Sequence, residues 1–426
     1  MIKIMRYNEV PMDEVFARSV PEVDVAGIVS DIIAEVKRRG DAALFDYCQK
    51  FDQVRLTSLE VSPAEFDAAM AAVEPEFIDV LETAAENIRN FHEKQVRHSF
   101  IIAEKDGVVM GQKVTPLDKV GLYVPGGTAS YPSTVLMDAI PAKIAGCGEI
   151  VMVTPPARDG SVNPAILAAA KVAGVDRVIK VGGAQAVAAL AWGTETVPCV
   201  DKIVGPGNAF LAEAKKQVFG RVAIDMIAGP SEILVVADGN SNPREVAADL
   251  LSQAEHDKMA SAVLVTDSAQ LAEAVQAEVE RQVRLLPRVE IASASIDVNG
   301  KIIVADNLDQ AIEIANAIAP EHLELCVDNP FDWLDKVRHA GSIFMGRNCP
   351  EALGDYLAGP NHTLPTGGTA RFYSPLSVDD FVKKSQYTYF TREALSAVSD
   401  KIARFARKEG LEGHARSALS RFDNAQ

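Results

Sequence analysis

The spacing of hydrophobic residues divides the chain into regions of different structure. Up to about residue 110 the apolar positions recur with a helical period, which predicts helices over 25–39, 63–73 and 75–91. From Lys119 onward, short β-type runs alternate with Ala-rich amphipathic segments. This alternation is typical of βαβ units that form a mostly parallel sheet.

The β-type runs fall into two groups. The first comprises KVGLYV, EIVMVT, RVIKVGG, DKIVGPG and ILVVAD, and the second comprises SAVLVTD, KIIVAD, LELCVD and SIFMG. Predicted helices over 268–286, 307–318 and 331–339 separate the runs of the second group, and 391–422 is again helical. We therefore expect an α/β fold of two Rossmann-like parallel-sheet modules, with a helical N-terminal region and a helical C-terminal tail.

Composition narrows the class of protein. A chain of 426 residues exceeds one ordinary core, so two or more domains are expected. With 42 Lys or Arg against 59 Asp or Glu, the net charge is −17, which argues against a nucleic-acid partner. No apolar run has the length of a membrane span or a signal peptide, so we expect a cytoplasmic protein without a membrane partner.

The cysteines and histidines carry different signals. Five scattered cysteines without a CxxC pair predict reduced thiols, and argue against a thiolate zinc site. Three histidines, His92, His98 and His339, are expected at the surface. The other four stand near a carboxylate or carboxamide and are predicted to share a site: His256, His322, His362 and His414.

Several of these residues suit a metal ion. Gln253 and His256 are spaced i, i+3 in a predicted helix, although such a pair is also consistent with an ordinary polar helix end. Asp355 and His362 lie in a Gly- and Pro-rich stretch that we expect to be a loop. Together with His414, the residues Gln253, His256 and Asp355 would form a nitrogen and oxygen donor set that suits zinc.

Two further features point to catalysis and to a nucleotide. Glu321 and His322 adjoin after a proline, and can serve one substrate only if a turn splays them, since a strand would send them to opposite faces. The chain has no GxGxxG motif. Four glycine turns, at 126–127, 182–183, 205–207 and 229, each follow a β-type run. As a set they favour a nucleotide or phosphate ligand at one sheet edge.

The sequence resembles the histidinol dehydrogenase family over almost its whole length. The segments that carry the resemblance are VGLYVPGG, VGGAQAVAALA, DKIVGPGNAF, DMIAGPSE, DLLSQAEHD, APEHLEL, GPNHTLPTGGTARFYSPLSVDDFVK and EGLEGHARS. The resemblance implies zinc-dependent oxidation of L-histidinol to L-histidine through histidinal, with two NAD reduced, in the last steps of histidine biosynthesis.

The resemblance also assigns roles to residues. It implies one zinc ion per subunit, held by Gln253, His256, Asp355 and His414, and an acid–base pair of Glu321 and His322. Substrate contacts would come from the zinc ligands and His322, together with Ser231, His362 and Glu409. NAD contacts would come from Tyr123, Gln185 and Asn208.

The implied organisation is a homodimer with shared active sites. Residues 1–20 would form an N-terminal arm, and 21–122 with 232–376 a larger α/β domain that carries the metal and acid–base residues. Residues 123–231 would be an inserted NAD-binding module. The tail over 377–426 would cross to the partner subunit, so that Glu409 and His414 complete the partner's site.

Three alternatives stay open at this point. The closest is a related NAD-dependent dehydrogenase of another polar alcohol, such as a sulfonated diol; Ser231, Glu409 and the run SPLSVDDFVK argue against it. The second is covalent aldehyde oxidation by Cys147 or Cys349, neither of which has an activating motif. The third is a zinc hydrolase or a non-catalytic zinc protein, which would leave the glycine turns unexplained.

Overall fold

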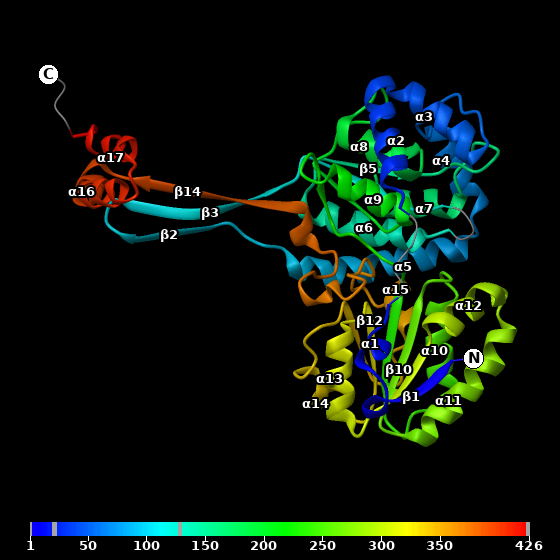
Figure 1. Ribbon diagram of the computed structural model, residues 1–426. Helices are drawn as coiled ribbons and strands as arrows, with labels where there is room; N and C mark the ends of the chain where they lie inside the picture. The colour runs from blue at the N-terminus through cyan, green and yellow to red at the C-terminus, as the bar shows by residue number, and fades with distance from the viewer. Residues whose placement is uncertain (1, 19–23, 127–129, 423–426) are drawn as a thin grey trace. The chain divides into compact units, whose positions relative to one another are not determined.

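The structure, a computed structural model, describes residues 2–18, 24–126 and 130–422. The chain separates into two compact units, 1–95 with 117–381 and 96–116 with 382–426. The first unit contains two parallel sheets and the second a small antiparallel sheet, and each unit is described by itself (Figure 1). The expected α/β architecture with two parallel-sheet modules is confirmed.

The first parallel sheet, sheet A, has six strands. Their order is β1 (Lys3–Arg6), β11 (Lys301–Val304), β10 (Ser261–Thr266), β9 (Glu232–Ala237), β12 (His322–Cys326) and β13 (Ser342–Met345). Near-continuous apolar runs such as that of β9 suit a strand covered on both faces. Helices α10 (Pro243–Ala254), α11 (Ala269–Gln282) and α12 (Val289–Asn299) cover one face, and α13 (Leu308–Ile318) with α1 (Met12–Val15) covers the other.

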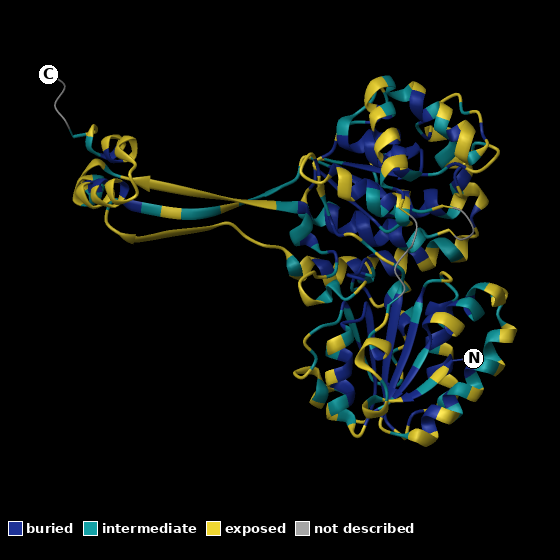
Figure 2. Cartoon of the chain, in the orientation of Figure 1, coloured by how far each residue is buried: buried dark blue, intermediate teal, exposed yellow. Residues whose placement is uncertain are grey.

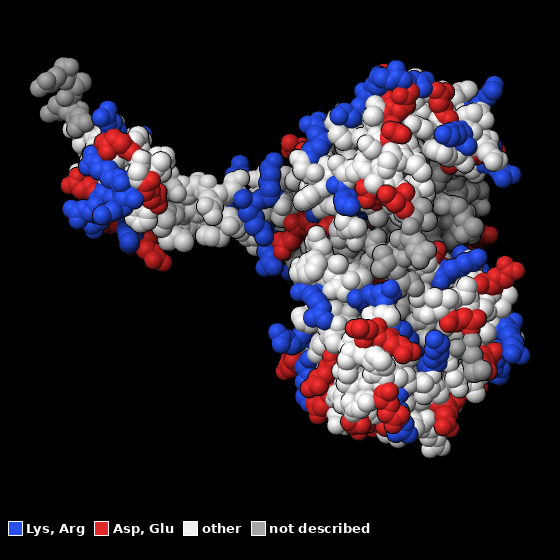
Figure 3. Space-filling model, viewed as in Figure 1, with Lys and Arg blue, Asp and Glu red and all other residues white. Residues whose placement is uncertain are grey.

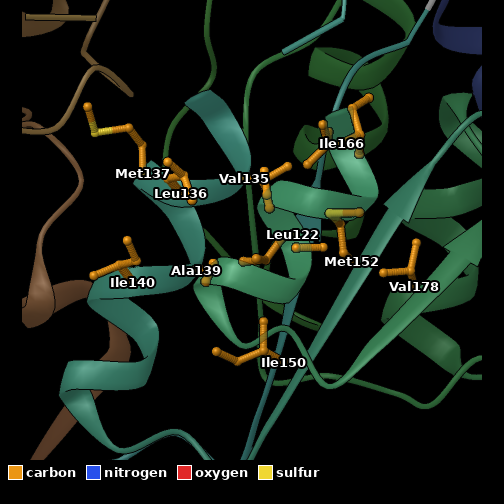
Figure 4. Close-up of a cluster of buried hydrophobic side chains, with 14 of the residues drawn as sticks. Leu122, Val135, Leu136, Met137, Ala139, Ile140, Ile150, Met152, Ile166 and Val178 are labelled. Carbon is orange, nitrogen blue, oxygen red and sulfur yellow. The ribbon is translucent and has the colours of Figure 1, made fainter. Parts of the chain in front are cut away.

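The second parallel sheet, sheet B, has five strands. Their order is β6 (Arg177–Lys180), β5 (Glu149–Thr154), β4 (Lys119–Tyr123), β7 (Lys202–Val204) and β8 (Ala223–Ile224). Helices α6 (Pro132–Ala145) and α7 (Pro164–Ala173) cover one face, while α8 (Gly183–Trp192) and α9 (Ala209–Val218) cover the other. Figure 4 shows side chains of α6 and α7 meeting those of β4, β5 and β6 in this core.

The N-terminal helices pack on sheet B. They are α2 (Ala26–Arg39), α3 (Asp41–Tyr47), α4 (Pro63–Ala72) and α5 (Pro75–His92), so the three predicted helices are confirmed. Helices α4 and α5 join the core of α6 and α7, and α2 and α3 join that of α8 and α9. This packing differs from the expected grouping of 21–122 with 232–376, because the apolar faces of these helices are buried against the Ala-rich helices of sheet B.

The second unit contains strands where the sequence predicted mostly helix. Strands β14 (Val382–Phe390), β3 (Val108–Pro116) and β2 (Phe100–Lys105) form an antiparallel sheet, and α16 (Arg392–Lys408) and α17 (Glu412–Leu419) follow. The strands β2 and β14 are almost entirely exposed, in contrast to the buried strands of sheets A and B (Figure 2). Their apolar residues do not alternate with polar ones, so they lack the hydrophobic pattern by which a strand is predicted.

The predictions for the cysteines and for His92 have different outcomes. All five cysteines are free, which confirms the absence of disulfides, although Cys199 is exposed. The prediction that His92 lies at the surface is wrong: it is fully buried, and its Nδ1 lies 2.7 Å from Oε1 of Gln95 at the end of α5. None of the described helices combines the length and apolarity needed to cross a membrane.

Candidate active site

The acid–base candidates lie where the chain enters β12. Helix α13 ends at Ile318, and Ala319 then adopts a left-handed conformation with a φ of 52°. A residue with a Cβ atom rarely takes this conformation, which costs about 1–3 kcal/mol and often marks a functional site. Pro320 and Glu321 follow, and His322 is the first residue of β12. The strained turn therefore delivers Glu321 and His322 to the amino edge of sheet A.

The backbone of one residue, Glu232, holds both side chains. Its N–H donates to Oε2 of Glu321 at 2.9 Å, and its carbonyl oxygen lies 3.0 Å from Nδ1 of His322. A carbonyl oxygen can only accept, so Nδ1 carries the proton and Nε2 of the neutral ring carries the lone pair. Oε2 of Glu321 is then 3.8 Å from Nδ1 of His322. The turn that a shared site for Glu321 and His322 requires is therefore present.

The free nitrogen of His322 lies near two carboxylates. Nε2 is 3.8 Å from Oδ1 of Asp355 and 4.0 Å from Oε1 of Glu351. Desolvation lowers the pKa of His322 below its usual value, and the charge of Glu351 partly opposes this shift. The imidazole is therefore neutral near pH 7, and its Nε2 can accept a proton.

More carboxyl groups surround His322 than a buried site can hold in the ionised form without a nearby positive charge. Burial, reinforced by the nearby charges of Glu232, Asp355 and Glu351, raises the pKa of Glu321 well above its usual value. Burial and the charge of Glu351 likewise raise the pKa of Asp355. His322, Glu351 and Asp355 each direct a ligand atom to one place. Buried carboxylates ionise together only beside a cation, so this arrangement suits a metal ion or a cationic substrate.

Helix α10 supplies the first pair of predicted metal ligands. It begins after Asn242, whose side chain caps the helix by accepting a hydrogen bond from the N–H of Arg244 at 3.1 Å. Gln253 is buried in the last turn of the helix. His256 lies in the turn that follows, where its N–H donates to the carbonyl of Gln253 at 3.1 Å. The two side chains therefore keep the i, i+3 spacing of one helix face.

Asp355 lies on a short helix, so the prediction that it belongs to a loop is wrong. Helix α15 (Glu351–Tyr356) begins after Pro350 and carries both Glu351 and Asp355. Gly354 lets this helix approach sheet A closely, because a Cβ at that position would collide with the ring of Phe344. The glycine that suggested a loop is thus a packing residue within a helix.

The segment that carries His362 is a loop, as expected, and is tied to α6 on both sides. Asn361 donates to the carbonyl of Met137 at 2.6 Å, and the hydroxyl of Thr363 donates to Oδ1 of Asp138 at 2.9 Å. His362 keeps some solvent exposure, yet desolvation lowers its pKa to about 4.

The predicted NAD residues gather at the carboxyl edge of sheet B. Tyr123 ends β4, and its hydroxyl accepts a hydrogen bond from the N–H of Gly183 at 3.0 Å. Gln185 is buried in the first turn of α8, and Asn208 caps α9 by accepting from Phe210 N at 3.1 Å. The N-terminus of α8 has no side-chain cap, so its amides can meet an anion.

A buried ion pair shapes the loop before α9. Lys215 pairs with Asp225, donates to the carbonyl of Gly205 at 3.0 Å, and leaves Asp225 to accept from Gly205 N at 2.9 Å. Gly205 has a φ of 118°, and a Cβ there would collide with the carbonyl of Tyr123. Only glycine allows the ends of β4 and β7 to approach so closely.

For the other predicted site residues, Ser231, Glu409 and His414, the structure shows no contact with the acid–base pair among the described residues. Ser231 is half-buried immediately before β9, and its carbonyl accepts from Ser261 N at 2.9 Å. Glu409 and His414 belong to the second unit, where both are exposed. Their assignment to the site stays a prediction.

Sequence reasoning missed four carboxylates of this region. Glu351 and Glu232 touch the acid–base pair, while the half-buried Asp249 and the buried Glu324 lie close to each other on α10 and β12. Burial and the charge of Asp249 raise the pKa of Glu324 to about 9. The run HLELC contained a signal for these carboxylates. Alternation along a strand places His322, Glu324 and Cys326 on one face, and a face of a buried parallel sheet is normally apolar.

The two cysteines considered as nucleophiles are poorly suited to that role. Cys147 is buried, and desolvation raises the pKa of its thiol to about 11. Cys349 lies just before α15, and its thiol has no base partner among the side chains that the structure describes. Because the thiolate is the reactive species, the geometry favours the Glu321–His322 pair as the reacting groups.

Comparison with known proteins identifies the family. The histidinol dehydrogenase family model matches residues 17–422. A histidinol dehydrogenase of Clostridium acetobutylicum is 57% identical over 94% of this chain and 93% of its own length, and one of Bacillus cereus is 52% identical over 100% and 97%. The crystal structure of histidinol dehydrogenase from Elizabethkingia anophelis has a TM-score of 0.94 and 40% identity, covering 99% of this chain and 98% of that one. The chain belongs to the histidinol dehydrogenase family of NAD-dependent oxidoreductases.

Proposed function

We propose that this protein oxidises L-histidinol to L-histidine through histidinal, reducing two NAD molecules in the last steps of histidine biosynthesis, and that it requires zinc. One observation carries the proposal. Within the part of the chain that the structure describes, Oε1 of Gln253, Nε2 of His322 and Oε1 of Glu351 are buried without a hydrogen-bond partner. Buried polar atoms are normally satisfied, so these three atoms are arranged for a bound group.

The donor set fits zinc. Gln253, His256 and Asp355 offer one oxygen, one nitrogen and one carboxylate, and we propose that His414 of a second copy supplies the fourth ligand. The unpartnered Oε1 of Gln253 and the raised pKa of Asp355 both indicate that a cation is needed here. When bound, zinc would orient the amine and imidazole nitrogens of the substrate and fix the carbon that reacts.

The acid–base pair divides the chemistry between two proton transfers. We propose that Nε2 of His322 takes the hydroxyl proton of the alcohol as the hydride leaves, since Nδ1 is committed to the Glu232 carbonyl. Glu321 would then remove a proton from water, which adds to the aldehyde and gives the hydrate that donates the second hydride. The hydrogen bond from the N–H of Glu232 holds the carboxyl group of Glu321 beside His322 for this step.

The carboxyl edge of sheet B is the proposed NAD site. Tyr123, Gln185 and Asn208 lie there, next to the uncapped N-terminus of α8. We assign NAD binding to 123–231 together with the helices of 26–92 that pack on it. An acidic protein holds an anionic cofactor through such local amides and helix dipoles.

We further propose a homodimer in which residues 377–426 cross to the partner. Residues 96–116 and 382–426 contain 12 Lys or Arg and 7 Asp or Glu, although the whole chain has a net charge of −17. Basic side chains gather over α16 and α17 (Figure 3). Ile101, Tyr389 and Phe405 of this unit are also exposed. The exposed apolar side chains favour a contact that covers them. The positive charge of this unit favours an acidic surface of a second copy as that contact.

Parallel assays on two substrates test the proposed function. NADH formation is measured with L-histidinol and with a sulfopropanediol, at equal concentrations and with zinc present. The proposal predicts turnover of histidinol, with the diol at least ~100-fold slower because the site's polar groups would be left unpaired. Preferential turnover of the diol would assign a different substrate, and no NADH from either would reject the dehydrogenase activity.

A further inference from the structure

Arg18, which is distant in the sequence from the reacting residues, forms an ion pair with Glu232, the residue whose backbone binds Glu321 and His322. Nε of Arg18 lies 2.8 Å from Oε1 of Glu232, and Nη2 lies 3.3 Å from Oε2, so the ion pair is bidentate. The same Nη2 donates to the carbonyl of Ile318 at 2.5 Å. The side chains are 30% and 10% exposed, which shields the pair from solvent screening.

Both contacts of Arg18 lead directly to the acid–base pair. Glu232 donates its N–H to Glu321 and accepts from Nδ1 of His322 through its carbonyl. Ile318 is the last residue of α13, three positions before Glu321. Arg18 therefore joins the start of β9 to the turn that presents both reacting residues.

The turn needs an external restraint. Ala319 adopts a left-handed conformation, which an alanine holds only when its surroundings enforce it. Behind it, the carbonyls of Pro320 and Glu321 accept from Gly341 and Ser342 at 3.0 and 2.9 Å. On the other side, the guanidinium of Arg18 is the cation bonded to the Ile318 carbonyl.

We infer that Arg18, in the N-terminal segment, is a positioning residue that fixes the distance between Glu321 and His322 and the direction of Nε2 of His322. The inference rests on the proposed function, because it assigns Arg18 a task in that reaction. Removing Arg18 should slow both hydride transfers alike, since Glu232 holds both groups. A defect in Glu321 alone would slow only the second.

The chain offers a matched control for the stability that any such ion pair contributes. Arg177 makes the same pattern of contacts in sheet B: Nε and Nη2 bind the carboxylate of Glu60 at 2.8 and 2.7 Å, and Nη2 donates to the carbonyl of Thr196 at 2.9 Å. Its side chain is 27% exposed. Arg177 lies at the amino end of β6, at the edge of sheet B opposite the carboxyl edge where the NAD residues lie, and it is outside the acid–base pair.

The test compares Arg18→Gln, Arg18→Lys and Arg177→Gln as zinc-loaded, full-length enzymes. Zinc content, Tm, KM for histidinol, kcat and single-turnover rates of both hydride transfers are measured. We expect Arg18→Gln to lose kcat by ~10-fold or more at both steps, with KM within about twofold and zinc retained. Arg18→Lys keeps the positive charge but loses the bidentate guanidinium geometry, so its kcat should lie between those of wild type and Arg18→Gln. Arg177→Gln should lose Tm but keep kcat within about twofold.

A second measurement does not depend on turnover. In protein labelled with ¹⁵N-histidine, the Nδ1 proton of His322 is assigned by its absence in His322→Gln. Its exchange with water should be ~10-fold faster in Arg18→Gln and unchanged in Arg177→Gln. Equal kcat and equal exchange in the two variants would overturn the inference, as would zinc loss in Arg18→Gln. A wild-type enzyme that forms no NADH from histidinol would reject the proposed function instead, while the exchange rates would still decide the role of Arg18.

Discussion

Nδ1 of His322 donates to the backbone carbonyl of Glu232 over 3.0 Å, which leaves Nε2 as the basic nitrogen. The same Glu232 donates its N–H to Glu321 at 2.9 Å. One residue of β9 therefore sets the tautomer of the proposed base for the alcohol step and the position of the proposed base for the aldehyde step. This division of labour can be tested in each residue separately.

Replacing the two acid–base residues should give different kinetic defects. Glu321→Gln should still release about one NADH per site in a single turnover, with the second slowed ~10²-fold or more. His322→Asn should be slow from the first hydride. Rapid-quench single turnovers make the comparison, because slow product release can mask a chemical defect in steady state. Equal loss of both hydrides in Glu321→Gln would make Glu321 a positioning group for His322.

Removing a metal ligand should reduce zinc content and activity together. His256→Asn should bind zinc at least ~10-fold more weakly, because one of four ligands is lost. The exposed His98 provides a control, and His98→Asn should keep its zinc. Zinc is measured by atomic absorption after dialysis. Full zinc occupancy in an inactive His256→Asn would reject the ligand assignment.

Mixing two inactive variants should restore activity if the tail crosses between subunits. A heterodimer of His414→Asn and His322→Asn chains can assemble one native site and one doubly defective site. Random exchange of equal amounts then gives activity at up to about one quarter of the wild-type sites. Subunit exchange is verified by native mass spectrometry with one chain tagged. No recovery despite exchange would place each site within one chain.

The buried Asp138 should make stability fall with rising pH. Burial raises the pKa of this carboxyl to about 8, whereas an unfolded Asp has a pKa of ~3.9. Between these values the folded state binds more protons, so stability decreases as pH rises, by at most ~1.4 kcal/mol per pH unit. Relative to wild type, Asp138→Asn should therefore gain stability between pH 5 and pH 8.

Urea unfolding at the two pH values measures this difference. The exposed Asp335→Asn is the control and should differ from wild type by the same amount at both pH values. A gain in Asp138→Asn no larger than in the control would show that Asp138 is ionised in the folded protein. The result also bears on His362, because Asp138 anchors the adjacent Thr363.

The sequence alone predicts the elements of this fold better than their packing. Periodicity identified the buried strands and α2, α4 and α5, because each has one strongly apolar face or run. It could not show that these helices cover sheet B, since an apolar face does not specify its partner. Strands β2, β3 and β14 were missed because their apolar residues do not alternate regularly with polar ones, so the period of a strand is weak in the sequence.

The site shows the same limit at the level of residues. Motifs brought attention to His322, Gln253 and Asp355, whose types and spacing suit chemistry. Arg18 and Glu232 are separated by 214 positions and no motif links them, so only the folded chain brings them together. Glu351 was overlooked because a single Glu in a surface-like stretch carries no signal, although it is buried beside His322.

The stoichiometry of NADH formation with and without metal shows whether the enzyme carries out both oxidations of histidinol and whether it needs zinc. Limiting L-histidinol is converted to completion with excess NAD by the zinc-loaded enzyme, by enzyme treated with a chelator, and by treated enzyme to which zinc is returned. We expect two NADH per histidinol, loss of the reaction on chelation, and recovery with zinc. One NADH per histidinol with accumulation of the aldehyde, or full activity after verified removal of the metal, would contradict this expectation.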